Sequence, residues 1–316
     1  MQMKILVTGA AGFIASHLCE KLVSMGHLVF GIDNFNDYYD VKLKEINASD
    51  LVNKGVTIFR EDLNADLKSV FENQYDYIFH LAAQPGISAA TPLHEYVDNN
   101  IYATQNLLDS VVKYNPDLKL FVNIATSSVY GKEATVNETA IPKPASYYGV
   151  TKLAAEQLVL SLKIEGKIKA CSVRLYSVYG PRERPEKLYT KLIENLYYDK
   201  PFPLFEGSIY HERSFTYVGD IVEGLAAIIG KEELVDGEII NLGTDEVNTT
   251  QEGITAVEEI MNKKLIIDNQ PPRKGDQLKT AAIIDKARNL LNYNPKVSLK
   301  QGLQEQVNWY FEKFIN

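Results

Sequence analysis

The sequence predicts an α/β fold built on a doubly wound parallel sheet, with a smaller, interleaved C-terminal α/β part. Three observations carry this prediction. Short apolar runs alternate with segments of helical periodicity, a glycine-rich turn joins the first run to the first helical segment, and an acidic residue ends the second run. Alternation of this kind is typical of parallel strands whose carboxyl ends share one edge of a Rossmann-type sheet, where ligands bind.

The first strand is expected at residues 3–8, a run with branched apolar side chains of the type buried in parallel sheets. The turn that begins at Gly9 leads into a helix to about Met25, and Gly26 follows as its C-cap. A second strand at residues 27–32 runs directly into Asp33.

This opening unit indicates a dinucleotide cofactor. Gly9 permits a tight turn, and Gly12 lets backbone N–H groups approach a pyrophosphate at the positive end of the helix. Asp33 follows Gly9 by 24 residues, where a carboxylate can accept hydrogen bonds from both hydroxyls of an adenosine ribose. That carboxylate would repel a 2′-phosphate, so the sequence predicts NAD rather than NADP. The alternative is a pair of glycines that only help a helix to pack.

The same alternation continues downstream. We expect a helix to about residue 54, strands at 56–62, 77–83, 118–125 and 169–175, and helices at 92–114 and 146–165. Beyond Tyr179 the rhythm loosens into a charged turn at 180–185, extended pieces at 201–205 and 214–218, a helix from Asp220 and a strand at 238–242 that returns to the main sheet.

The tail is expected to add helices at 283–291 and 299–314 as a small cap over the sheet edge. Residues 1–179, together with 218–243, are thus predicted to form the nucleotide-binding domain. Residues 180–217 and 244–316 are predicted to form the second part, which binds the substrate.

Composition excludes several functions. A formal charge of −8 argues against a nucleic-acid surface. No apolar run approaches the roughly 20 residues that cross a bilayer, and the first strand leaves no room for a signal peptide. Cys19 and Cys171 make no disulfide framework and are expected as reduced core residues of a cytoplasmic protein. The five histidines show no ligand spacing, so no metal site is expected.

A hydroxyl-rich strand end, Thr126-Ser127-Ser128, is followed twenty residues later by Tyr148 and Lys152. At positions i and i+4 of a helix, the last two project from one face. An adjacent ammonium group favours the phenolate, so Tyr148 is a candidate general base for a sugar or alcohol hydroxyl. Tyr38 and Lys42 share the spacing but are predicted to lie in a surface loop and helix start. The alternative for Tyr148 is an ordinary aromatic helix face.

Seven segments together resemble an extended short-chain dehydrogenase/reductase, and within it the nucleotide-sugar 4-epimerases. They are residues 8–14, Asp33, 80–83, 126–131, 148–152, 213–218 and 273–276, and they cover nearly the whole chain. Ala15 departs from the third glycine of most members, but alanine is small enough for the same close packing. The resemblance also implies a homodimer in which the helices at 92–114 and 146–165 pair across a two-fold axis.

The resemblance implies a reaction. Related dehydratases carry an Asp-Glu pair where this chain has Ser127 and Ser128, which cannot supply that chemistry. What remains is epimerisation at C4 through a transient 4-keto sugar. Tyr148 takes the C4 hydroxyl proton, Thr126 bonds the same oxygen, and Lys152 holds the nicotinamide ribose of a permanently bound NAD.

The resemblance also implies two sets of binding residues. Those for the cofactor are Gly9, Ala11, Gly12, Phe13, Ile14, Asp33, Asn34, Asp62, Leu63, Leu81, Ala82, Ala83, Asn99, Tyr148 and Lys152. Those for a UDP-sugar are Gln84, Ser127, Ser128, Ser177, Arg184, Leu204, Phe205, Arg213, Arg273, Asp276 and Thr280. In the second set, Arg213 and Arg273 match the phosphate-binding arginines, with surface salt bridging as their alternative role.

The choice of sugar rests on three positions. Segments 31–40 and 180–185 resemble UDP-glucuronate 4-epimerases, in which Arg184 would pair with a C6 carboxylate. Segment 84–88 lacks the arginine common there, and the small Thr280 would leave room for a 2-acetamido group. The sequence therefore favours UDP-N-acetylglucosamine, with UDP-glucose beside it, and UDP-glucuronate is the alternative. A net NAD-dependent oxidoreductase and a non-catalytic dinucleotide sensor are further alternatives, although a sensor would tend to lose Tyr148 and Lys152.

Overall fold

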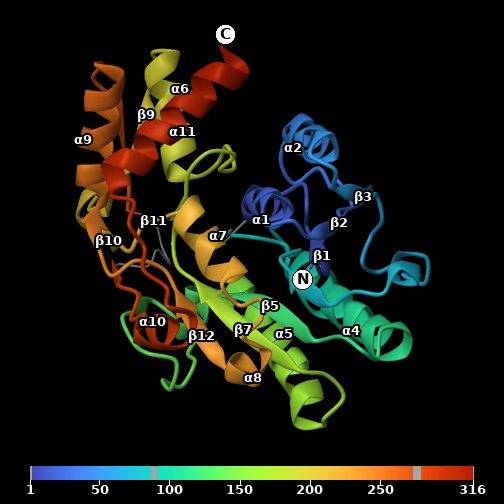
Figure 1. Ribbon diagram of the computed structural model, residues 1–316. Coiled ribbons are helices and arrows are strands. Elements are labelled where there is room, and N and C mark those ends of the chain that lie inside the picture. Colours follow the sequence, from blue (N-terminus) through green and yellow to red (C-terminus); the bar gives the residue numbers. More distant parts are fainter. Residues whose placement is uncertain (1, 87–90, 273–278, 316) are drawn as a thin grey trace.

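The computed structural model describes residues 2–86, 91–272 and 279–315. Its centre is a seven-stranded parallel sheet with the order β12-β7-β5-β4-β1-β2-β3 (Figure 1). The chain winds outward from β1 to β3 and then crosses over to β4 and the strands beyond it. Strand order therefore reverses between β1 and β4, as the doubly wound prediction requires. The predicted fold class is confirmed.

The strands of this sheet are β1 (Lys4–Thr8), β2 (Leu28–Ile32), β3 (Thr57–Phe59), β4 (Tyr77–His80), β5 (Leu120–Thr126), β7 (Ala170–Leu175) and β12 (Ile239–Leu242). The helices are α1 (Phe13–Ser24), α2 (Val41–Asn53), α3 (Leu93–Val97), α4 (Ala103–Tyr114), α5 (Tyr147–Ile164), α6 (Leu188–Tyr197), α7 (Val218–Ala226), α8 (Glu232–Val235), α9 (Thr250–Met261), α10 (Asp285–Leu291) and α11 (Leu299–Phe314). Short strands outside the main sheet are β6 (Glu133–Ala134), β8 (Val178–Tyr179), β9 (Phe202–Phe205), β10 (Glu212–Arg213), β11 (Thr216–Tyr217), β13 (Asn248–Thr249), β14 (Ile267–Gln270) and β15 (Lys279–Thr280).

Helices cover both faces of the sheet, which explains the continuous apolar runs of its central strands. Every residue of β5 is buried. On one face, Leu18 of α1 and Ile221 of α7 belong to one hydrophobic core. On the other face, Leu107 of α4 and Val159 of α5 belong to a second. The predicted return of the segment at 238–242 to the main sheet is also correct, because β12 pairs in parallel with β7.

The C-terminal part has a hydrophobic core of its own, which corrects the prediction of a tail that only caps the sheet edge. Leu192 of α6, Val257 of α9 and Leu303 of α11 pack together in it. Figure 1 shows these three helices gathered at one side of the sheet. Of the two tail helices, α10 lies against the edge strand β12. The apolar face of α11 meets α9 and α6, so it is buried there and not on the sheet.

The helix predicted at 92–114 is interrupted. A π-helical turn at Asp98–Tyr102 separates α3 from α4. Asn100, which is buried in this turn, donates from Nδ2 to the Thr151 hydroxyl at 3.0 Å, and its Oδ1 accepts the Gln84 N–H at 2.7 Å. Single π turns are common near functional sites because the extra residue redirects a side chain. Here the turn ties α5 to the end of β4. Within the described residues, no helix is long and apolar enough to span a bilayer.

Candidate active site

A cavity of about 500 Å³ opens at the carboxyl ends of the strands, where the strand order reverses. Gly9 and Asp33 reach it from the ends of β1 and β2, and Ala82 reaches it from the end of β4. Thr126 and Ser177 line it beyond β5 and β7. Ligands of open α/β sheets bind at this point, because neighbouring strands lead in opposite directions and leave a crevice between them.

The turn from β1 into α1 is shaped for close approach. Gly9 has a φ of +68°, and a Cβ there would lie 3.0 Å from the Cα and N of Ala82, so only glycine fits. Gly12 is the N-cap of α1, whose first turn holds no acidic residue. The positive end of a twelve-residue helix therefore points into the cavity, which is the arrangement that binds a pyrophosphate.

Asp33 lies at the adenosine end of the predicted cofactor site and is only 7% exposed. Its carboxylate accepts backbone N–H bonds from Ala11 at 3.1 Å and Phe35 at 2.8 Å. Burial raises the pKa of this carboxyl against the opposing effect of those bonds. The side chain is thus held in one orientation at the end of β2. Its role toward the two ribose hydroxyls stays a prediction.

The start of α5 brings Tyr148 to the end of β5. Ser146 caps the helix by accepting the Gly149 N–H at 3.1 Å. A Cβ at position 149 would lie 2.7 Å from the Ser128 carbonyl oxygen, so the glycine allows α5 to pack directly on the 127–130 turn. Tyr148 and Thr126 consequently line the same cavity, and the Thr126 side chain acts to lower the pKa of the Tyr148 hydroxyl.

Burial controls the protonation of the predicted acid–base pair. Lys152 is 3% exposed, and burial lowers its pKa to about 8 against the attraction of Glu156. The pKa of the Tyr148 hydroxyl is raised by burial, while its bond to Thr126 and the charge of Arg184 act to lower it. The Tyr148 pKa is therefore not lowered, contrary to the prediction from Lys152. The cost of removing a phenolate from water exceeds the stabilisation that these neighbours provide.

The loop after β8 forms the opposite wall of the cavity. Glu183, Arg184 and Lys187 all line it. The Arg184 guanidinium carbon lies 5.6 Å from the ring centroid of Tyr38, and an Arg184 nitrogen lies 2.9 Å from Glu186 at the rim. This wall therefore carries cations in the same cavity as the hydroxyl groups at the end of β5 and the start of α5.

Glu183 should make stability depend on pH. Burial raises its pKa to about 7, and its carboxyl accepts bonds from Gln306 and Thr190. Because the unfolded carboxyl ionises near 4.5, the stability it contributes is complete below that pH and is lost as the pH rises through 7. We expect Glu183→Gln to gain stability relative to the wild type between about pH 5 and about pH 8 in urea denaturation. A constant difference between the two proteins across this range would contradict the assignment.

Most of the predicted site residues lie together in this cavity. Its lining includes Gly9, Gly12, Phe13, Ile14, Asp33, Asn34, Asp62, Leu63, Leu81, Ala82, Ala83, Asn99, Thr126, Ser127, Ser128, Tyr148, Lys152, Ser177, Arg184 and Arg213. Ala11, Gln84, Leu204, Phe205 and Thr280 do not contribute to the lining. Arg273 and Asp276 lie outside the described residues. The roles of all these residues remain predictions.

Thr280 does not stand where the choice of sugar requires it. The residue is fully buried in β15, which pairs with β10 and β6. Its hydroxyl accepts the Ser214 N–H at 3.3 Å. Since the side chain contacts a backbone strand and not the cavity, its small size leaves no extra room for a 2-acetamido group. Gln84 likewise faces Asn100 through its backbone, behind the cavity wall.

Two tyrosines of the loop after β2 lie in the site although the sequence did not predict them there. Tyr38 was predicted at the surface, but Tyr38 and Tyr39 both line the cavity. Lys44, which is 5% exposed, donates to the Asn36 carbonyl and side chain at 2.8 and 2.7 Å and so ties the loop to α2. Two adjacent tyrosines directly after a strand end that carries Asp33 were the available signal. Periodicity could not show them, since a loop has none.

His80 has a structural role. Its Nδ1 lies 2.8 Å from the Thr8 hydroxyl and its Nε2 lies 2.9 Å from the Thr104 hydroxyl. Burial lowers its pKa to about 3, so the ring is neutral. The Thr8 hydroxyl also accepts the Ala82 N–H at 3.0 Å, which holds the end of β4 beside the glycine turn. Among the described residues, no cluster of His, Cys, Asp or Glu could hold a metal ion.

Comparison with known proteins identifies the family. Residues 5–243 match the NAD dependent epimerase/dehydratase family. The chain belongs to this family. The resemblance to extended short-chain dehydrogenase/reductases is thereby confirmed, and with it an NAD-dependent enzyme.

The relatives match nearly the whole of this chain. An uncharacterized UDP-glucose epimerase, YtcB of Bacillus subtilis, is 40% identical over 311 residues, which cover 96% of this chain and 97% of that protein. UDP-glucuronate 4-epimerase 3 of Arabidopsis thaliana is 33% identical over 97% of this chain and 76% of its own. The crystal structure of UDP-glucuronic acid 4-epimerase from Bacillus cereus in complex with UDP-glucuronic acid and NAD matches 99% of this chain and 100% of that chain, with 37% identity and a TM-score of 0.93. The protein is therefore an NAD-dependent isomerase of the sugar-nucleotide epimerase type.

Proposed function

We propose that this epimerase acts on UDP-glucuronate, which it interconverts with UDP-galacturonate through a 4-keto intermediate. The observation that carries the proposal is the position of Arg184. Its side chain is 11% exposed and lines the cavity, and its charge acts on the Tyr148 hydroxyl. A carboxylate at C6 of the sugar would lie close to the reacting C4 oxygen. A guanidinium group that lines the same cavity as the Tyr148 hydroxyl suits that carboxylate in charge and in bidentate geometry.

The relatives support this choice over UDP-N-acetylglucosamine. Enzymes named UDP-glucuronate 4-epimerase occur among them in Arabidopsis thaliana and in Thermodesulfobacterium geofontis, the latter 34% identical over 96% of this chain. The preference for the acetamido sugar depended on Thr280, which lies behind the cavity wall. It also depended on the missing arginine in segment 84–88, and Arg184 supplies a cation from the opposite wall. The alternative that the sequence held open is therefore the better-supported function.

The proposed chemistry uses the groups already described. Tyr148 accepts the proton of the C4 hydroxyl while Thr126 bonds the same oxygen. When bound, NAD would supply reversible hydride transfer at C4, with no net oxidation. Lys152 and the helix end at Gly12 would hold the dinucleotide, and Arg213 would bind the diphosphate. After the 4-keto sugar turns within the cavity and is reduced on its other face, Tyr148 returns the proton to the C4 oxygen.

The two-part division of the chain is also proposed. Residues 1–179 and 218–243 would bind NAD, and residues 180–217 and 244–316 would bind the UDP-sugar. The separate core of α6, α9 and α11 supports this division. A homodimer through α4 and α5 is proposed from Tyr147 and Val150, which expose 56% and 48% of their surface on α5.

The direct test is incubation of the purified protein with UDP-glucuronate and no added NAD. We expect an equilibrium mixture with UDP-galacturonate, resolved by anion-exchange chromatography. Parallel reactions with UDP-glucose and UDP-N-acetylglucosamine give the specificity. Faster conversion of UDP-N-acetylglucosamine would overturn the substrate assignment, and turnover that requires stoichiometric NAD would identify a net oxidoreductase.

Arg184→Gln should separate the acidic substrate from the neutral ones. Loss of a hydrogen bond to a charged group, on the order of 1.5–3 kcal/mol, predicts a decrease of about 10- to 100-fold in kcat/KM for UDP-glucuronate. For UDP-glucose, which has no carboxylate, we expect a change of less than about 3-fold. Initial rates on both substrates measure this difference. An equal loss on both would mean that Arg184 does not bind the carboxylate.

A further inference from the structure

Arg182 lies two residues before Arg184 but is directed away from the cavity. Its side chain is 9% exposed and its Nη2 donates to Glu20 of α1 at 2.8 Å and to Asp50 of α2 at 3.3 Å. The preceding residue is held as well, because His17 Nε2 lies 2.9 Å from the Pro181 carbonyl oxygen. Burial lowers the His17 pKa to about 4, so the neutral ring donates from Nε2. The loop after β8 is thus tied to the first two helices of the chain.

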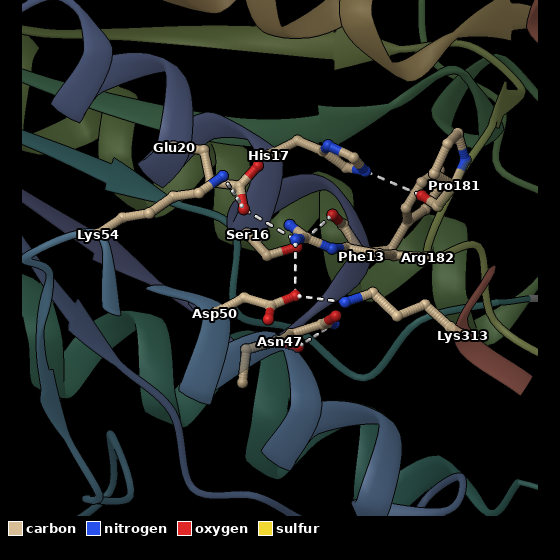
Figure 2. A network of polar contacts seen from close by, with 11 residues as sticks. Phe13, Ser16, His17, Glu20, Asn47, Asp50, Lys54, Pro181, Arg182 and Lys313 are labelled. Carbon is tan, nitrogen blue, oxygen red and sulfur yellow. Dashed lines mark hydrogen bonds and ion pairs between the residues drawn. The ribbon is translucent and has the colours of Figure 1, made fainter. Parts of the chain in front are cut away.

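Two lysines complete this group of ion pairs, which Figure 2 shows from close by. Lys54 lies 3.0 Å from Glu20, and Lys313 of α11 lies 3.5 Å from Asp50. We refer to Arg182, Glu20, Asp50, Lys54 and Lys313 as the Arg182 network. It joins α1 and α2 on the nucleotide side to α11 on the other side of the loop.

Three successive residues of the loop make different contacts. Arg182 binds α1 and α2 and does not line the cavity, whereas Glu183 and Arg184 both line it. Glu183 also binds Gln306 of α11 at 2.9 Å. The backbone at Arg182 has a φ of +67°, a left-handed conformation that is unfavourable for a residue with a Cβ. The ion pairs anchor the Arg182 side chain at this point of the loop. The next two side chains leave the backbone directly after this anchor.

We propose that Arg182 is a positioning residue whose network holds Arg184 in the cavity and so sets the preference of the enzyme for a sugar nucleotide with a carboxylate. This inference rests on the proposed function, since it concerns the same carboxylate. Arg182 itself does not line the cavity. Its effect on the substrate must pass through the loop backbone.

The network can be opened without leaving an isolated buried charge. When Arg182 is replaced by methionine, Glu20 retains Lys54 and Asp50 retains Lys313. Methionine preserves the aliphatic volume of the arginine stem. The variant Arg182→Met should therefore fold. It lacks only the ion pairs that connect the loop to Glu20 and Asp50.

The experiment compares Arg182→Met, Arg184→Gln, their double variant and the wild type, each as the full chain with its bound NAD. KM and kcat are measured with UDP-glucuronate, and UDP and UDP-glucose are measured as competitive inhibitors of the same reaction. Lys21→Gln is the matched control, because it breaks an exposed ion pair on the same helix, with Glu223 at 2.5 Å, outside the network. Thermal melting of each variant reports its stability.

For Arg182→Met we expect KM for UDP-glucuronate to rise about 5- to 20-fold, in the range of couplings carried through intermediate residues, with kcat and both inhibition constants within about 2-fold of the wild type. The double variant should match Arg184→Gln alone, since a displaced arginine and an absent one are equivalent. Lys21→Gln should behave as the wild type. A merely structural role would lower the melting temperature and shift all ligands equally.

Each other outcome is decisive. If Arg184→Gln raises KM for UDP-glucuronate and Arg182→Met does not, the proposed function stands and the positioning role is wrong. If Arg182→Met weakens the binding of UDP, UDP-glucose and UDP-glucuronate equally, the positioning role is also wrong. If Arg184→Gln leaves KM for UDP-glucuronate unchanged, the proposed function fails and the inference fails with it.

Discussion

Tyr148→Phe should lose about 10²- to 10⁴-fold in kcat, the range that a positioned general acid–base contributes. The phenyl ring preserves the packing of the helix start against the 127–130 turn, but no hydroxyl remains to take the C4 proton. Thr126 keeps its bond to the Ser128 N–H at 3.2 Å, so the neighbouring hydroxyl stays in place without replacing the base. Initial rates with UDP-glucuronate give the decrease.

The matched control is Tyr147→Phe, one residue earlier on α5. Tyr147 is 56% exposed and does not line the cavity. We expect Tyr147→Phe to keep wild-type activity. We also expect both variants to retain NAD, which is measured by unfolding each purified variant and recording the absorbance of the NAD released into the supernatant. Residual activity of Tyr148→Phe above about a tenth of the wild type would remove Tyr148 from the role of base, since general bases contribute at least about 10²-fold.

Arg174→Met should lower the free energy of unfolding by about 3–5 kcal/mol, because it leaves Glu156 as an unpaired buried charge. The Arg174 and Glu156 side chains are 2% and 0% exposed. Arg174 donates to Glu156 through Nε at 3.0 Å and Nη2 at 2.5 Å, and Ser172 adds a third bond at 3.0 Å. Urea denaturation measures the loss. Glu156 lies one helical turn beyond Lys152 on α5. Its charge opposes the lowering of the Lys152 pKa by burial.

The double variant Arg174→Met/Glu156→Met is its control. Replacement of a whole buried pair by apolar residues is often neutral or stabilising, so the double variant should recover most of the stability that the single variant loses. Equal destabilisation by the single and double variants would show that packing volume matters there and the charge does not. If the double variant recovers its stability but not the activity of the wild type, Glu156 contributes to the protonation of Lys152.

The nucleotide half could be predicted from the sequence because its site residues follow strands directly. Gly9, Asp33, Ala82 and Thr126 each come just after an apolar run, and parallel strands bring their carboxyl ends to one edge by necessity. Tyr148 needed one further inference, that a helix beginning some twenty residues after β5 returns to that strand. The close contact of Gly149 with the Ser128 carbonyl is the physical reason that it does.

The substrate half was harder for a corresponding reason. Thr280 was predicted to face the sugar from the resemblance to the family, but a strand of two residues can turn a side chain either way. In the structure it faces Ser214. The tyrosines of the loop after β2 and the cations of the loop after β8 have no period to reveal their direction. Each is oriented by contacts with parts of the chain that are distant in sequence.

Local pattern by itself determined that this protein has a parallel Rossmann sheet, a nucleotide turn at Gly9 and a tyrosine–lysine pair on one helix face, because strand and helix periods dictate which residues share an edge or a face. Only the tertiary structure decided which cations line the cavity. Arg182 and Glu20 are separated by 162 positions in the chain. Their pairing depends on the packing of α1, α2 and α11 around one loop, and no period in the sequence encodes a contact between elements so far apart.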